Sequence, residues 1–130
     1  MARGPRKPQP TRLKKRAEFL AAARGKRRHA AAFALQAVLR SGDDAEPPRF
    51  GLTVSKKVDA RAVRRNRIRR RLRAALVQGA ALSAAPGVDY VFVARAEALG
   101  RPFAALVADM AGALTAIGRP EGRTEKRRAK

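Results

Sequence analysis

The sequence predicts an α+β fold in which three helices pack on a small sheet, in the order α-β-β-α-β-α. Two runs with alternating apolar residues, at 30–40 and 50–55, have the period of half-buried strands. A short apolar run at 90–94 has the composition of a central strand. Residues 103–117 carry large apolar side chains three and four positions apart, which is typical of an amphipathic helix.

The N-terminal part is expected to hold a tail and a first helix. Residues 1–10 contain three Pro, one Gly and three basic residues, which is typical of a disordered basic arm. Thr11 is a candidate cap for a helix over residues 13–24, and Gly25 is a candidate stop signal. The expected apolar side of this helix consists of Leu13, Ala17, Leu20 and Ala21.

A basic connector at 26–29 is expected before the first strand, with His29 facing solvent instead of acting as a catalyst. The first strand would place its odd positions on one face, although its alanines would also suit a helix. A loop at 41–48 follows and contains three of the ten acidic residues. In the second strand Phe50, Leu52 and Val54 alternate with Gly51, Thr53 and Ser55.

The next helix is dominated by arginine. Residues 61–73 contain eight arginines and no acidic residue, and the helical pattern continues through Leu76. A helical wheel puts Arg69 and Arg71 at the borders of two opposite faces, with Arg65 nearer the apolar one. The apolar face consists of Ile68, Leu72, Ala75 and Leu76. The polar face consists of Asn66, Arg67, Arg70 and Arg73.

This arginine face indicates a polyanionic partner. Solvated charged faces usually mix signs, whereas this face is entirely positive and repels itself in water. The whole chain has 31 basic and 10 acidic residues, a formal charge of +21. Nucleic acid is therefore the expected partner, and RNA that binds the folded state should stabilise it.

The C-terminal part is expected to complete a single domain over residues 11–118. A loop of small residues at 78–87 precedes the central strand, Pro102 suits the first turn of the last helix, and Gly118 ends it. Residues 119–130 are expected to form a second disordered basic tail.

Several classes of function are disfavoured. The chain has no Cys and one His, which excludes disulfides and cysteine-based metal sites. No apolar run approaches the roughly 20 residues of a membrane-spanning helix, and no signal peptide is visible. Nucleotide-binding loops, metal-ligand spacings and an activated nucleophile are also missing. We therefore expect a binding protein, whose chemistry is supplied by a partner if it belongs to an enzyme.

Four segments together resemble the protein subunit of bacterial ribonuclease P. They are R-L-K-K-R-A-E-F (12–19), F-G-L-T-V-S-K-K (50–57), R-N-R-I-R-R-R-L-R (65–73) and D-Y-V-F-V-A-R (89–95). The resemblance covers most of residues 11–117 and leaves both tails outside.

The resemblance implies an α+β fold with the arginine helix in a left-handed βαβ crossover. It implies that the chain is the protein component of a ribonucleoprotein endoribonuclease in the cytoplasm. The catalytic RNA subunit and precursor tRNA would be its partners, with no membrane and no obligate protein partner. Mg²⁺ would be held mainly by the RNA and the substrate, and the chain itself would contain no catalytic or metal-binding residue.

The resemblance also implies residue roles. Residues expected to bind the RNA subunit are Arg65, Asn66, Arg67, Arg69, Arg70 and Arg73. Residues expected to contact phosphates are Lys56, Lys57, Arg61 and Arg64. Residues expected in a cleft for the 5′ leader are Phe19, Phe33, Thr53 and Ser55. Ala23 and Gln36 stand where relatives often carry aromatics, so the cleft should stack fewer bases. Arg71 replaces an apolar residue, which predicts looser packing or a larger RNA surface.

Two alternatives remain open. A ribosomal or other structural RNA-binding protein would explain the charge and the tails equally well, but not the ordered set of motifs. A DNA-binding protein would place the arginine helix in a major groove, yet no helix-turn-helix partner is apparent. Cleavage of precursor tRNA separates the three hypotheses.

Overall fold

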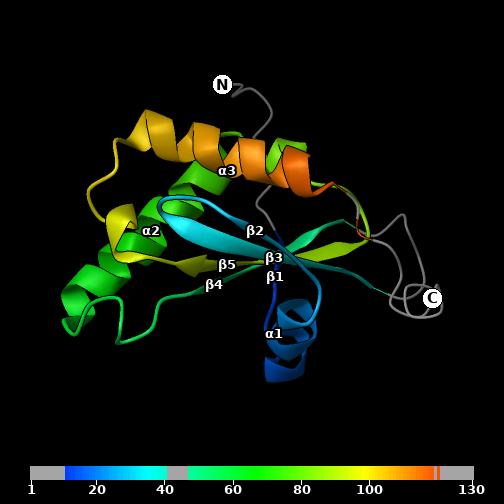
Figure 1. The fold of residues 1–130 in the computed structure, drawn as a ribbon, viewed down its shortest axis with the longest axis horizontal. Helices are drawn as coiled ribbons and strands as arrows, with labels where there is room; N and C mark the ends of the chain where they lie inside the picture. The colour runs from blue at the N-terminus through cyan, green and yellow to red at the C-terminus, as the bar shows by residue number, and fades with distance from the viewer. Residues whose placement is uncertain (1–10, 41–46, 119, 121–130) are drawn as a thin grey trace, which may run out of the picture.

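The computed structural model describes residues 11–40, 47–118 and 120, which form a mixed five-stranded sheet with three α-helices (Figure 1). The predicted basic arm, the acidic part of the first loop and nearly all of the predicted C-terminal tail lie outside these residues. The elements are β1 (Thr11–Arg12), α1 (Arg16–Ala23), β2 (Lys26–His29), β3 (Phe33–Leu39), β4 (Arg49–Thr53), α2 (Ala62–Gln78), the 3₁₀ helix η1 (Ala80–Ser83), β5 (Val88–Ala94), the 3₁₀ helix η2 (Ala96–Ala98) and α3 (Phe103–Ile117).

The sheet has the strand order β1-β4-β5-β3-β2, with β5 at its centre as expected. β4 and β5 are parallel neighbours joined through α2, which confirms the βαβ arrangement around the arginine helix. β3 runs antiparallel to β5, and β2 runs antiparallel to β3. The left-handed sense of the crossover stays a prediction.

The two faces of the sheet are covered differently. α2 and α3 pack on one face and enclose the main core, where Phe33 and Phe92 meet edge to face at 5.1 Å and Phe50 stacks on Tyr90 at 5.6 Å. α1 packs on the other face, on the opposite side of the sheet from α3 (Figure 1). The smaller cluster under α1 consists of Leu13, Ala22, Val38 and Val91, with Phe19, Ala21 and Val93 against it.

Alternation along the strands decides which side chain belongs to which face. In β4 the side chain of Phe50 is buried in the main core, whereas Gly51 is backed by Phe19 of α1. Because paired residues share a face, Gly51, its partner Val91 and the next partner Gln36 all lie on the side of α1. We call this surface the α1-side face of the sheet.

The sequence did not predict two of the strands. The segment expected to be a basic connector is β2, which pairs with β3, and β1 is a two-residue strand on the opposite edge of the sheet. All four residues of β2 are exposed, so the strand has no apolar alternation to reveal it. Charged residues on an edge strand disfavour pairing with another chain.

The first helix differs from its expected position. Thr11 belongs to β1 instead of capping a helix, and α1 begins after Lys15. Its first turn is closed by Glu18, whose Oε1 accepts hydrogen bonds from the backbone N–H groups of Lys14 and Lys15. Ala17 and Leu20 are exposed, because the helix contacts the sheet mainly through Phe19 and Ala22.

Candidate nucleic-acid interface

The exposed side of α2 carries arginine and asparagine opposite its apolar side. Ile68, Leu72 and the other apolar residues on their side are buried, as the helical wheel predicts. Three residues on the opposite side, Asn66, Arg67 and Arg70, are exposed. The half-buried members of the arginine set are Arg65, Arg69, Arg71 and Arg73. We call the exposed side, with Arg69 and Arg73 at its borders, the arginine face.

One carboxylate partly compensates the positive charge at the start of α2. Asp59 accepts a hydrogen bond from the backbone N–H of Arg61 through Oδ1 (2.9 Å) and lies 3.5 Å from Nη1 of Arg64 through Oδ2. That backbone hydrogen bond, and then the nearby arginines, hold the pKa of Asp59 below its ordinary value. Arginines near a helix N-terminus add to the positive end of the helix dipole, so this end of α2 favours anions.

Two arginines of α2 are engaged with the backbone of neighbouring segments. Arg65 donates from Nη1 to the carbonyl oxygens of Asp59 (3.0 Å) and Ala60 (2.8 Å). Arg71 donates from Nε to the carbonyl oxygen of Ala98 (3.0 Å) and from Nη2 to that of Arg101. Arg71 therefore fixes α2 to the segment around η2 by hydrogen bonds, at a position where the resemblance implies an apolar residue in relatives.

Positive charge is concentrated where the arginine face approaches β1. Burial, followed by the like charges of Arg12 and Arg69, lowers the pKa of Arg73 from its ordinary value. Arg69 also donates from Nη1 to Oδ1 of Asn66 (2.9 Å), which orients the amide on the exposed side. Like charges held together in this way favour a bound anion such as a phosphate.

The turn between β4 and α2 adds lysines beside this end of the helix. Lys56 and Lys57 are exposed, and the N–H of Val58 donates to the carbonyl oxygen of Ser55 (3.0 Å) to close the turn. Ser55 itself is exposed just beyond β4. The four residues predicted to contact phosphates thus lie in the turn and around the first turn of α2.

The residues predicted to line a leader cleft are divided between the two faces of the sheet. Phe19 is half-buried on the α1-side face. Thr53 is also half-buried, and it lies on the same face because it pairs with Val93. Phe33 is fully buried in the main core, so its assignment to the cleft was wrong. The reason is the register: Phe33 shares the odd positions of its strand with Leu35 and Ala37, which face α2 and α3.

A basic edge borders the α1-side face. Arg27 in β2 donates from Nη2 to the carbonyl oxygen of Ala23 in α1 (3.3 Å). Nη2 of Arg95 lies 2.8 Å from Nδ1 of His29, and both side chains are exposed, as expected for His29. The sequence did not reveal this edge, because nothing in the local pattern of 26–29 assigns it to the sheet.

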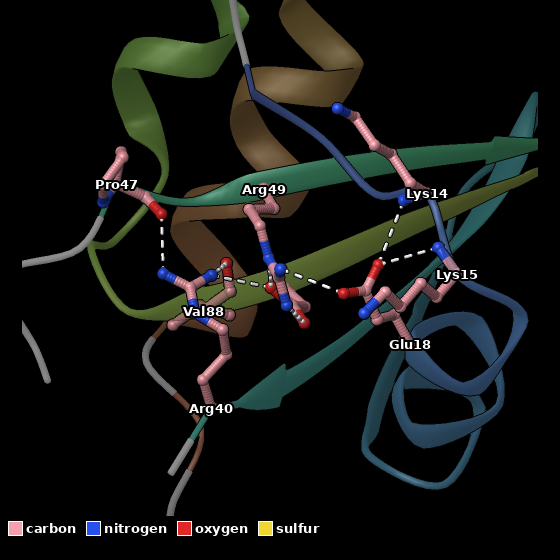
Figure 2. A network of polar contacts seen from close by, with 8 residues as sticks. Lys14, Lys15, Glu18, Arg40, Pro47, Arg49 and Val88 are labelled. Atoms are coloured by element: carbon pink, nitrogen blue, oxygen red, sulfur yellow. Dashed lines mark hydrogen bonds and ion pairs between the residues drawn. The ribbon is translucent and has the colours of Figure 1, made fainter. Parts of the chain in front are cut away.

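A polar network that the sequence did not reveal connects three strands with α1 (Figure 2). Its centre is Asp89, which is only 3% exposed. Asp89 accepts from Arg40 (Nη1 to Oδ1, 2.7 Å) and from Arg49 (Nε to Oδ1, 2.8 Å; Nη2 to Oδ2, 2.7 Å). Arg49 also donates from Nη1 to Oε2 of Glu18 (3.0 Å).

The hydrogen bonds of this network favour the charged forms of Glu18 and Arg49. The hydrogen bonds from the N–H groups of Lys15 and Lys14, and then the charge of Arg49, lower the pKa of Glu18. The hydrogen bond to Asp89 raises the pKa of Arg49. The only sequence signal is an acidic residue at the start of a central strand, with arginines at the ends of two others.

The described part of the chain offers neither a metal cluster nor a membrane span. Among residues 11–40, 47–118 and 120, no group of three or more His, Cys, Asp or Glu side chains is placed to hold a metal ion. Within the same ranges, no helix is long and apolar enough to cross a membrane.

Comparison with known proteins identifies the family. Residues 8–118 match the family model described as Ribonuclease P. The chain is 48% identical to the ribonuclease P protein component of Paramagnetospirillum magneticum over 82% of each chain. It is 42% identical to that of Brucella suis, over 86% of this chain and 83% of the relative.

A solved structure shares the fold. The ribonuclease P protein from Thermotoga maritima superposes with a TM-score of 0.70, at 22% identity, over 82% of this chain and 97% of that one. The chain therefore belongs to the bacterial ribonuclease P protein component family, the protein subunits of the ribonucleoprotein endonuclease that removes the 5′ leader of tRNA.

Proposed function

We propose that the arginine face of α2 binds the catalytic RNA subunit of ribonuclease P. The observation that supports this most strongly is the separation of the helix into a buried apolar side and an exposed side of one charge sign. Arginine forks suit phosphate oxygens, and the Asn66 amide can bond phosphates, sugars or bases. The proposed RNA-subunit contacts are Arg65, Asn66, Arg67, Arg69, Arg70 and Arg73. Arg65 already donates to two backbone carbonyl oxygens of the protein.

Additional phosphate contacts are proposed around the start of α2. These residues are exposed and surround a helix N-terminus, where anions are favoured. The proposed contacts are Lys56, Lys57, Arg61 and Arg64.

The α1-side face is proposed to receive the 5′ leader of precursor tRNA. Phe19 offers an aromatic ring, and Thr53 and Ser55 offer hydroxyl groups at the end of β4. Ala23 is exposed and Gln36 is half-buried, so this face offers fewer aromatic rings than relatives with aromatics at both positions. We expect leader recognition to depend more on Phe19 and on hydrogen bonding.

Catalysis is assigned to the RNA subunit, with Mg²⁺ held mainly by that RNA and by the substrate. The carboxylates of Glu18, Asp59, Asp89 and Asp109 form ion pairs with arginines. This engagement supports a protein that binds and orients RNA instead of holding the metal. We place the complex in the cytoplasm, with no obligate protein partner.

The decisive test is cleavage of precursor tRNA at low Mg²⁺ by a bacterial ribonuclease P RNA, with and without this protein. Accurate 5′ cleavage that the RNA alone performs poorly is the expected result. Tight RNA binding without any effect on cleavage would overturn the proposal.

A double variant tests whether α2 is the element that binds the RNA subunit. Arg67→Ala with Arg70→Ala should weaken binding to the RNA subunit and reduce the slope of log affinity against log salt by about 2. The fold should survive, because both side chains are exposed. The control is Lys26→Ala with Arg28→Ala, which removes the same charge from exposed positions of β2. An equal loss in both would assign the effect to net charge.

A further inference from the structure

The first helix is held on the sheet by few apolar contacts. Within α1 only Ala22 is fully buried, and Leu20 is 49% exposed. An eight-residue helix is not stable on its own in water, so it needs contacts with the rest of the fold. Because the apolar cluster beneath α1 is small, polar contacts supply an important part of the interaction that holds the helix on the sheet.

Those polar contacts form a continuous chain from the sheet to the start of α1. Asp89 is buried at the beginning of the central strand, and Arg49 bonds both of its oxygens. The remaining terminal nitrogen of Arg49 reaches Oε2 of Glu18, while Oε1 of Glu18 accepts the two backbone N–H groups that precede α1. The strands thus hold Arg49, Arg49 holds Glu18, and Glu18 fixes the helix start (Figure 2).

The neighbouring residue of α1 carries the proposed leader contact. Phe19 follows Glu18 directly, and its ring is so close to β4 that a Cβ on Gly51 would lie 2.5 Å from Cε1 of that ring. A shift at the helix start would therefore move this ring relative to the α1-side face. The arginine face belongs to α2, which packs on the opposite face of the sheet.

We propose that Glu18 is a positioning residue for precursor tRNA: through Arg49 and Asp89 it fixes α1, and with it Phe19, over the α1-side face. This inference rests on the proposed binding of the leader to that face. Glu18 itself touches the protein and not the substrate. Its loss should affect leader recognition and spare binding of the catalytic RNA.

The test is Glu18→Gln in the full chain, assembled with the catalytic RNA. Glutamine keeps an oxygen that can accept the two backbone hydrogen bonds, but it loses the charge that pairs with Arg49. Affinity of the holoenzyme for precursor tRNA should fall about three- to tenfold, as expected for the typical net contribution of one hydrogen bond. Affinities for mature tRNA and for the RNA subunit should be unchanged.

A simple effect of net charge would change the affinity for precursor tRNA in the opposite direction, so the measurement separates the two explanations. The substitution raises the formal charge from +21 to +22, and a more positive protein should bind RNA equally well or more tightly. The matched control is Glu97→Gln, an exposed carboxylate in η2 whose removal changes the charge equally. It should leave the ratio of precursor to mature tRNA affinity unchanged.

Hydrogen exchange of the free protein supplies a readout at the helix itself. Amides of residues 16–23 should exchange faster in Glu18→Gln, while those of α2 and β5 keep their wild-type rates. Unchanged exchange in α1, or an equal loss for precursor and mature tRNA, would overturn the positioning role. Faster exchange in α1 with no change in either affinity would instead overturn the proposed binding of the leader to this face. General loss of protection would make Glu18 a determinant of overall stability and would also overturn the proposal.

Discussion

Arginine performs two different tasks in this chain, and burial distinguishes them. Arg49 and Arg71 are partly enclosed and bond carboxylates or backbone carbonyls of the protein. Arg67 and Arg70 are exposed on α2, where a polyanion can reach them. The planar guanidinium suits both tasks because it presents several donors in a fixed geometry. Arginine content alone therefore overstates the size of the RNA-binding surface.

The network around Glu18 predicts a specific dependence of stability on pH. Because the pKa of Glu18 is lowered in the folded state, its contribution is complete above the ordinary value of 4.5 and is lost as pH falls through the folded value. The free energy of local opening of α1, measured by hydrogen exchange of residues 16–23, should therefore be lower for Glu18→Gln than for wild type at pH 6. The difference should shrink steadily below pH ~4. A difference that stays constant down to pH ~3 would contradict the ionic role of Glu18.

At the scale of elements, the accuracy of the sequence-based expectations followed the strength of the local pattern. α2, α3 and β4 have clear periodicity and β5 is a continuous apolar run, and all four formed close to where they were expected. β2 and β1 have no apolar alternation, since they are edge strands that are defined by pairing with a neighbour. The partner of β1 lies far along the chain, and β2 carries only exposed polar side chains, so no local pattern indicates either strand.

The same limit applies to the candidate site. The wheel placed Asn66, Arg67 and Arg70 correctly on the exposed side of α2, because helix geometry is local. The role of Phe33 and the pairing of Asp89 with Arg49 depend on which strands are neighbours and in which register. The sequence alone could not supply that information.

Two glycines differ in the space around them, so replacing each with Ala should have opposite effects on stability. A Cβ on Gly25 would lie 2.0 Å from the carbonyl oxygen of Ala37, so the backbones of two elements would have to separate. Gly25→Ala should destabilise the protein by about 1–3 kcal/mol, the usual range for overpacking. Gly112 lies in α3, where an added Cβ would meet no neighbouring element within 4 Å, so Gly112→Ala should stabilise by about 0.5–1 kcal/mol.

Urea denaturation of both glycine variants measures these changes. Equal effects of the same sign would show that helix propensity, and not the close approach of α1 to β3, governs both positions. Gly25→Ala should also speed hydrogen exchange in α1 more than in α3, since the clash lies beside α1.

At the scale of the whole molecule, the sheet separates two surfaces with different proposed partners. α2 lies on one face and α1 on the other, so one chain can bind the catalytic RNA and the leader at the same time. The net charge of +21 disfavours the compact state through self-repulsion. An anion bound to the folded state relieves this repulsion, which links folding to RNA binding.

That linkage predicts a large thermal shift. A polyanion at about 100 times its Kd stabilises the folded state by about 2.7 kcal/mol, which corresponds to a rise in Tm of about 10 °C for a domain of this size. Inorganic polyphosphate is a suitable probe because it does not interfere with circular dichroism of the helices. Sodium chloride at equal ionic strength screens repulsion without binding specifically, so it should raise Tm much less. In the Arg67→Ala/Arg70→Ala variant the polyphosphate shift should shrink, because two of the exposed charges that bind the anion are gone. A shift that chloride reproduces in full would mean that screening, and not anion binding on the arginine face, stabilises the fold.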